Sequence, residues 1–315
     1  MSLRIFFPMI AWVFLLFTSC QKDKNPVIEN LNNPGENEDS VNISYPYIDT
    51  LSFITYNVAG LPEVLSHGDP AHNTSEIGRR LSPYAVVAVQ EDFNYNHFLY
   101  GTDKHPFRTS WSGPVPIGDG LNVMSNYKIS DLKRNKWDAC NGFDCLTPKG
   151  FTYNKLQIVE GATIDIYDVH ANAGQDEKDH LARQSNLFQL YHYIETHSQG
   201  QAVIIMGDFN SRYSYIGDTA EIFYQLGFTD TWMDYTRKNL GFPSKNNKNT
   251  DTVCESQPGT FMCETEDKIF YRSSDKIKLN LIHFDRPKNE FMRDGKDMSD
   301  HIPVTSDFEI TVKYK

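Results

Sequence analysis

One continuously apolar run constrains the fold of this chain more than any other segment. Residues 202–206 read Ala-Val-Ile-Ile-Met, with no polar residue among them. Such a short apolar run indicates a strand buried on both faces, because a half-exposed strand alternates apolar and polar residues. Further strand-like runs, several of which do alternate, lie at 51–58, 85–90, 120–125, 151–158, 163–170, 268–272 and 302–313.

Helical patterns lie between some of these strands. Residues 74–81, 176–197 and 218–226 place apolar residues near a helical period, and the last pattern ends at Gly227. Strands that follow one another both with and without an intervening helix indicate a mixed sheet. Two such sheets packed face to face would leave the helices outside. We therefore expect an α/β (α+β) fold built as a four-layer sandwich, with two mixed β-sheets face to face and helices outside.

The N-terminus has the features of an export signal. A basic Arg4 precedes the apolar run 5–17, which is too short to span a bilayer and is followed by Thr-Ser-Cys20. This ending resembles a bacterial lipobox, so we expect residues 1–19 to be a signal peptide and Cys20 to be lipidated. The alternative is ordinary signal cleavage with Cys20 lost or incidental. Gln21 after the cysteine favours an outer-membrane lipoprotein of the bacterial cell envelope, attached to the membrane through its lipid anchor.

Residues 20–46 are rich in Asn, Glu, Asp and Pro, and we expect them to form a flexible polar tether. The remainder, 47–315, has the length of one large α/β catalytic domain, which we expect to be a monomer. The formal net charge is −11, and the sequence contains no basic tract. Nucleic-acid binding normally depends on Lys and Arg contacts with phosphates, so a nucleic-acid partner is less expected.

Four cysteines follow Cys20, an even number that suits an oxidising compartment. Both close pairs lie in loop-like surroundings, so we expect the disulfides Cys140–Cys145 and Cys254–Cys263. The competing interpretation is a four-cysteine zinc site. Neither pair has the two-residue spacing typical of such sites.

Polar side chains stand where several predicted strands end. A carboxylate that closes a buried apolar strand must be paired or bound to a metal. Hard oxygen donors hold Mg²⁺, and a histidine near its ordinary pKa is suited to proton transfer, with an Asp partner to fix its tautomer. These are the parts of a divalent-metal phosphoester hydrolase. The strand-end residues are Asn57, Glu91, His170, Asp208, Asn210, Asp267, Asp300 and His301.

Their order and spacing resemble the endonuclease/exonuclease/phosphatase (DNase I-like) superfamily. The most specific motifs are Gly207-Asp208-x-Asn210 and Ser299-Asp300-His301-x-Pro303-Val304, supported by Asn57 and by Gln90-Glu91. The resemblance covers essentially residues 51–310 and implies the superfamily's fold, with hydrolysis of a phosphoester by metal-assisted attack of water.

Three shorter segments are similar to sphingomyelinase-like phospholipases C within that superfamily. They are Asn57-Val-Ala-Gly-Leu-Pro62, Gln90-Glu-Asp-Phe93 and Lys149-Gly-Phe151, the last entered through a cysteine-bearing loop. Two features depart from that branch. The turn His170-Ala-Asn-Ala-Gly174 is closer to that of abasic-site endonucleases, and the sequence shows no aromatic-rich hairpin of the kind that anchors secreted sphingomyelinases in lipid.

The resemblance implies which residues hold the metal and the phosphate. Glu91 would be the principal metal carboxylate, with Asn57 beside it. Asp300 would be a further metal carboxylate or a support for one. Asp208 and Asn210 would orient the attacking water and bind the scissile phosphate.

It also implies which residues move protons. His301 would be the general base, held by Asp267 so that its free nitrogen faces the water. His170 would stabilise the transition state or protonate the leaving group. Asn172 and Lys149 are further candidates for phosphate contact, although a solvated loop lysine is the ordinary interpretation of Lys149.

We therefore expect an Mg²⁺-dependent phosphodiesterase that acts on a phospholipid such as sphingomyelin, most similar to a sphingomyelinase-like phospholipase C. A nuclease, or an inositol- or sugar-phosphate phosphatase on the same scaffold, is the enzymatic alternative. A surface-binding lipoprotein that kept the fold is the alternative without catalysis.

Overall fold

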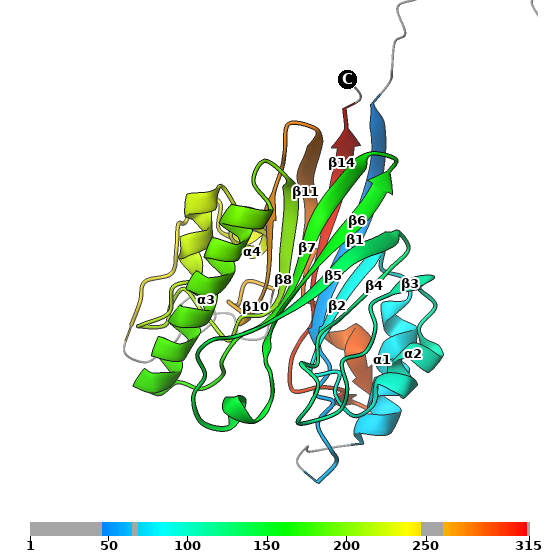
Figure 1. Ribbon diagram of the computed structural model, residues 1–315, viewed down its shortest axis with the longest axis vertical. Helices are drawn as coiled ribbons and strands as arrows, with labels where there is room; N and C mark the ends of the chain where they lie inside the picture. The colour runs from blue at the N-terminus through cyan, green and yellow to red at the C-terminus, as the bar shows by residue number, and fades with distance from the viewer. Residues whose placement is uncertain (1–45, 65–68, 247–260, 314–315) are drawn as a thin grey trace, which may run out of the picture. The chain divides into compact units, whose positions relative to one another are not determined.

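Two six-stranded β-sheets dominate the computed structural model, which describes residues 46–64, 69–246 and 261–313 (Figure 1). Helices α1 and α2 lie outside the sheets on one side, and helices α3 and α4 lie outside them on the other. The strands are β1 Tyr47–Asn57, β2 Val86–Gln90, β3 Phe107–Arg108, β4 Asn122–Ser125, β5 Lys128–Lys136, β6 Gly150–Val159, β7 Ala162–His170, β8 Ala202–Asp208, β9 Thr229–Asp230, β10 Asp267–Arg272, β11 Ile277–Asp285, β12 Met292–Arg293, β13 Lys296–Asp297 and β14 Val304–Val312. The helices are α1 Pro70–Leu81, α2 Asn96–Thr102, α3 Glu177–His197 and α4 Thr231–Thr236, with 3₁₀ turns η1 Gly142–Leu146, η2 Ala220–Leu226 and η3 Lys288–Phe291.

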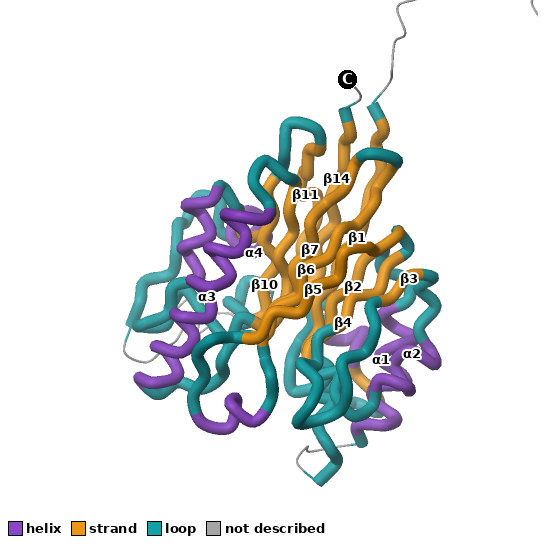
Figure 2. The backbone as a smooth tube through the Cα atoms, in the orientation of Figure 1, coloured by secondary structure: helices purple, strands orange, loops and turns teal. Residues whose placement is uncertain are grey.

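Both sheets are mixed, as the sequence predicts. The first has the order β11-β14-β1-β2-β4-β3, and the second has the order β5-β6-β7-β8-β10-β9. Each contains one parallel pair, β1 with β2 and β7 with β8, while the other neighbours run antiparallel. Figure 2 shows the strands of both sheets running together, with the loops collected at their ends. The predicted four-layer fold is confirmed.

The main hydrophobic core lies between the sheets. The predicted buried strand is β8, all seven of whose residues are buried. Across the core, the ring of Tyr271 on β10 meets the ring of Phe308 on β14 edge to face, with centroids 5.0 Å apart. Burying one large apolar side chain contributes roughly 1.5–3 kcal/mol, so this core supplies much of the free energy that holds the strand ends in place.

Helix α1 begins earlier than the predicted pattern. Asp69 caps it by accepting a hydrogen bond from His72 N at 3.3 Å, and Pro70 occupies the first helical position, where its missing N–H costs nothing. Its apolar face, including Ile77 and Leu81, packs on the outer side of the first sheet. A capping box between Asp176 and Asp179 starts α3 at the predicted place.

The remaining differences from the predicted elements have local causes. The third helical pattern forms the 3₁₀ turn η2 rather than an α-helix, and it ends at Gly227 with φ 78°, a left-handed conformation that glycine adopts without strain. Strands β5 and β11 were not predicted, and each forms an edge of its sheet. Strand β5 is largely polar, and the apolar residues of β11 are interrupted by polar ones. Among the described residues no helix is both long enough and apolar enough to cross a membrane.

Candidate active site

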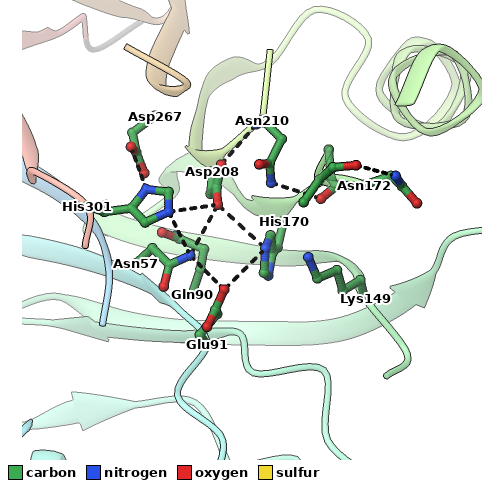
Figure 3. Close-up of polar contacts among 12 residues, drawn as sticks. Asn57, Gln90, Glu91, Lys149, His170, Asn172, Asp208, Asn210, Asp267 and His301 are labelled. Carbon is green, nitrogen blue, oxygen red and sulfur yellow. Dashed lines mark hydrogen bonds and ion pairs between the residues drawn. The ribbon is translucent and has the colours of Figure 1, made fainter. Parts of the chain in front are cut away.

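Strand pairing brings the predicted site residues to one end of both sheets. In the second sheet, Asp208 lies opposite His170 in the parallel pair and opposite Asp267 in the antiparallel pair. In the first sheet, Asn57 lies opposite Gln90, so Glu91 follows directly. Figure 3 shows the side chains of both sheets converging around Asp208. The register of the strands therefore builds the site.

The backbone adopts unusual conformations where these strands end. Glu91 and Asn210 have φ of 56° and 50°, which places two non-glycine residues in the left-handed region. A Cβ at Gly207 would lie 2.1 Å from the carbonyl oxygen of Val169, so only glycine lets β8 approach β7 at that point. The Asn210 N–H then donates to Asp208 Oδ1 at 2.9 Å. Such outliers cluster at functional sites and re-aim the side chains that follow a strand.

Asn57 connects the two sheets. Its amide nitrogen lies 3.1 Å from Glu91 Oε1 and 3.1 Å from Asp208 Oδ2, and the side chain is buried. Its amide oxygen accepts from the Ala59 N–H at 3.0 Å. Asn57 thus bridges two carboxylates, one from each sheet.

The predicted pair of Asp267 and His301 is present. His301 Nδ1 lies 2.9 Å from Asp267 Oδ2, which leaves Nε2 pointing into the site, 3.7 Å from Asp208 Oδ2. The hydroxyl of Ser299 accepts from the His301 N–H and donates to Asn57 O, which anchors the loop that carries the histidine. Burial alone would lower the pKa of His301, but the nearby carboxylates of Asp267 and Asp208 outweigh it and raise the pKa well above its ordinary value.

His170 has the opposite electrostatic character. Its Nε2 lies 3.5 Å from Asp208 Oδ2 and 3.9 Å from Glu91 Oε1. Its Nδ1 is buried and has no hydrogen-bond partner among the described residues. Burial, helped by the charges of Lys149 and His301, lowers the pKa of His170 well below its ordinary value. The environments of the two histidines thus shift their pKa values in opposite directions, which gives His301 the greater affinity for a proton and favours the neutral ring of His170.

The donor set fits a divalent cation. Burial raises the pKa of Asp208 to about 7, with the charge of His301 opposing the shift and that of Asp267 adding to it. Ligand atoms of Asp208, Asp267 and His301 lie within 4.8 Å of one another, and Glu91 approaches the same region through Asn57. Because Asp267 is already bonded to His301, the carboxylates of Glu91 and Asp208 are the better candidates for a hard cation.

The other predicted residues surround this centre. Asn210 donates to Ala171 O at 3.1 Å beside Asp208. Lys149 is largely buried and pairs with Asp144 at 2.7 Å, so it is not the solvated lysine of the ordinary interpretation. Asp300 is exposed and lies with Glu91 along a cavity of about 630 Å³, outside the group centred on Asp208.

Asn172 occupies a supporting position. Its side chain is buried, the oxygen accepts from the Asn141 N–H at 2.7 Å, and the nitrogen donates to Ala173 O at 2.6 Å. Both ends of the amide are therefore engaged within the turn and the neighbouring loop. Sequence reasoning gave no role to Asn141 or Asp144, because contacts of a loop leave no periodic pattern. The sequence feature that could have pointed to these two residues is the pair of cysteines on either side of Asp144.

The disulfide Cys140–Cys145 is present, so a zinc site at this pair is excluded. Cys263 is buried and disulfide-bonded. Its predicted partner Cys254 lies outside the described residues, as do Cys20 and the predicted signal and tether.

Comparisons with known proteins agree with this geometry. Residues 71–307 match the family described as Endonuclease/Exonuclease/phosphatase family 2. A protein of Mycobacterium tuberculosis named "Sphingomyelinase" is 37% identical over 268 residues, which are 82% of this chain and 52% of that protein. The chain therefore spans about half the length of the curated relatives it matches.

Solved structures share the fold at lower identity. Beta toxin from Staphylococcus aureus with bound magnesium ions has a TM-score of 0.56 at 18% identity, covering 82% of this chain and 99% of that one. D. rerio TDP2 complexed with a single-strand DNA product has a TM-score of 0.59 at 17% identity, covering 82% and 98%. The superfamily and fold predicted from the motifs are confirmed.

Proposed function

We propose that this chain, which belongs to the endonuclease/exonuclease/phosphatase family 2, is a divalent-cation-dependent phosphodiesterase whose substrate is a phospholipid of the sphingomyelin type. One observation carries the proposal. Glu91, Asn57 and Asp208 join the Asp267–His301 pair at a single point where the ends of both sheets meet. A binding protein has no evident need for all of these groups together. The substrate class is supported by the relative named "Sphingomyelinase".

The residues of the chain divide the chemistry between them. His301 Nε2 accepts a proton from the attacking water, and Asp267 holds the ring and stabilises the imidazolium that results. Asp208 and Asn210 orient that water. A bound Mg²⁺, held by Glu91 with Asp208, Asn57 and Asp300 as further candidates, would supply positive charge against the phosphoryl oxygens.

His170 and Lys149 act on the phosphate from the other side. The lowered pKa of His170 keeps the ring neutral, which favours hydrogen bonding to a charged oxygen over delivery of a proton to the leaving group. The Lys149 ammonium adds a positive charge close to it. Of the two roles considered for His170, stabilisation of the transition state is therefore the one that we propose.

A substrate panel tests the proposal. The full-length protein is incubated with sphingomyelin vesicles, phosphatidylcholine vesicles, plasmid DNA, abasic oligonucleotides and inositol phosphates, each with Mg²⁺ and with EDTA. We expect release of phosphocholine from sphingomyelin with Mg²⁺, loss of that activity in EDTA, and recovery when Mg²⁺ is restored. Undiminished turnover in EDTA would rule out the cation.

The panel also separates the alternatives. Nicking of plasmid or abasic DNA would replace the lipid substrate by nucleic acid, to which the −11 net charge is poorly suited. Release of phosphate from inositol phosphates would indicate a phosphatase. No turnover of any substrate would leave the non-enzymatic surface lipoprotein.

The proposed substrate suits an enzyme attached to the cell envelope. We propose that Cys20 carries the lipid anchor and that the chain is an outer-membrane lipoprotein, acting as a monomer. Replacement of Cys20 by Ala should move the protein from the membrane fraction to the soluble fraction. An unchanged distribution would contradict the anchor.

A further inference from the structure

A small disulfide-closed loop, Cys140–Cys145, lies beside the candidate active site. It includes most of η1 and connects β5 to β6, and none of the η1 residues is buried. Phe143 and Leu146 are 89% and 62% exposed. The loop therefore gains little from hydrophobic burial, and its disulfide and its polar contacts hold it in place.

Those polar contacts reach the turn that follows β7. The Asn141 N–H donates to Asn172 Oδ1 at 2.7 Å, and the Asn141 side chain donates to Asp179 Oδ1 at 2.6 Å. Asp144 Oδ2 accepts a hydrogen bond from the Ala173 N–H. Asn141 and Asp144, both between the bridged cysteines, thus form hydrogen bonds with the same turn.

The second carboxylate oxygen of Asp144 holds Lys149. Asp144 Oδ1 lies 2.7 Å from the Lys149 ammonium, whose side chain is only 11% exposed. Figure 3 shows this lysine extending toward His170. A lysine has a long flexible side chain, so its head group is well placed only if a partner fixes it. Asp144 is that partner, and the loop fixes Asp144.

The turn is held independently from its other side. Arg183, buried on α3, donates to Asn172 O at 2.8 Å and to Gly174 O at 2.9 Å. Asn186 accepts from the Asn172 N–H at 3.0 Å and donates to Ala139 O at 2.8 Å. The turn is therefore a fixed platform, against which the loop can place Lys149.

We propose that the disulfide-closed loop Cys140–Cys145 is a brace that positions Lys149 for the reacting phosphate, with Asp144 as the positioning residue. Opening the disulfide then lowers activity while the two sheets stay folded. The proposal rests on the proposed phosphodiesterase function. It adds a dependence of that activity on the redox state of one bond.

Hydrolysis of p-nitrophenyl phosphorylcholine, a soluble phosphodiester, tests the brace in the full-length protein with Mg²⁺. Asp144→Asn keeps an acceptor for the Ala173 N–H but removes the charge that holds Lys149. We expect its kcat/KM to fall about ten- to a hundredfold, the scale expected for a misplaced active-site group, and Asp144→Glu to recover part of the loss. Reduction with dithiothreitol and the double variant Cys140→Ser/Cys145→Ser should each produce a similar loss.

Two controls separate positioning from general damage. Adding Asp144→Asn to Lys149→Met should cost little further activity, because the two residues act as one unit. Phe143→Ala lies in the same loop, is exposed, and should leave hydrolysis of the soluble substrate unchanged.

Hydrogen exchange provides a readout that does not need activity. The Ala173 amide, which donates to Asp144, should exchange about tenfold faster in the Cys140→Ser/Cys145→Ser variant, while the Asn172 amide, held by Asn186, and strands β7 and β8 stay protected. Unchanged exchange would overturn the brace. Wild-type kcat/KM in both the reduced protein and Asp144→Asn would also overturn the brace. That result would leave the proposed phosphodiesterase activity intact. If the wild type cleaves no phosphodiester, the proposed function fails, and the exchange data alone decide whether the loop holds the turn.

Discussion

Asp208, Asp267 and His301 on one side of the site are fixed differently from Lys149 on the other. Pairing of β8 with β10 places Asp208 opposite Asp267, and Asp267 then bonds His301. Lys149 depends instead on an ion pair with Asp144, a residue of a small exposed loop. One group is held by the sheet, and the other is held by a local network and a disulfide.

The two arrangements should fail in different ways. A change in strand register would flip side chains to the other face of the sheet, so the sheet-held group is strongly specified. Single substitutions in that group should therefore report on chemistry alone. The loop-held group should respond to anything that opens the loop, even when no residue that contacts the phosphate is changed.

The largest expected effect comes from the sheet-held group. His301→Ala removes the proposed base, and we expect kcat/KM to fall by about a thousandfold, within the range that general base catalysis contributes. The ratio of wild-type to variant kcat/KM should be the same with and without dithiothreitol, because reduction of the loop affects both proteins equally. His192→Ala, at an exposed position of α3, is the matched control. Activity within tenfold of the wild type would remove His301 from the mechanism.

A smaller effect with a distinct pH signature is expected from Asp267→Asn. The negative charge of Asp267 helps to raise the pKa of His301, so in the wild type activity should increase as pH rises through that pKa and the ring loses its proton. Removing the charge lowers the pKa, so the rising limb of the pH–rate profile should move to lower pH. The maximum rate should fall by about a hundredfold, because the base is weaker and less well held.

The position of that limb is the deciding measurement. Glu195→Gln is the control, because Glu195 is an exposed carboxylate on α3. It should leave the rising limb of the pH–rate profile in place. An Asp267→Asn limb that coincides with the wild-type limb would mean that Asp267 does not control the proton on His301.

The same contrast explains what could be predicted from the sequence. Glu91, Asp208 and His301 could be predicted because an apolar run marks a buried strand, and a residue beside that run must lie where the strands of the sheet begin or end. Aligned strand ends then bring such residues together. The edge strand β5 was missed because its largely polar sequence carries no such signal, and β11 was missed because polar residues interrupt its apolar ones.

The loop-held side was less accessible for a physical reason. Spacing alone indicated the disulfide Cys140–Cys145, and motif similarity singled out Lys149. The partners of that lysine follow from the fold, because Asp144 meets Ala173 only after β6, β7 and the loop have been assembled. Arg183 was equally hidden, since a buried arginine on a helix looks like any charged helical residue in the sequence.

The smallest expected effect concerns stability, within the sheet-held part. Asp168 on β7 accepts from Gln90 Nε2 at 2.7 Å across the two sheets, and its other oxygen has no partner among the described residues. Burial raises the pKa of Asp168 well above its ordinary value. Because the folded state binds this proton more tightly than the unfolded state, the resulting stabilisation is present at low pH and is lost as pH rises.

Asp168→Asn keeps the acceptor for Gln90 without the buried charge. At pH 8 we expect its free energy of unfolding in urea to exceed that of the wild type by about 1–3 kcal/mol, the usual cost of an unsatisfied buried group, and the difference to shrink toward pH 4. Asp165→Asn on the same strand should have the opposite sign, because Asp165 is paired with Lys155 at 3.0 Å and accepts from Ser198 at 2.6 Å. Reductant should change neither difference, since both residues belong to the sheet-held part. An Asp168→Asn protein less stable than the wild type at pH 8 would show that the ionised carboxylate is satisfied in the folded state.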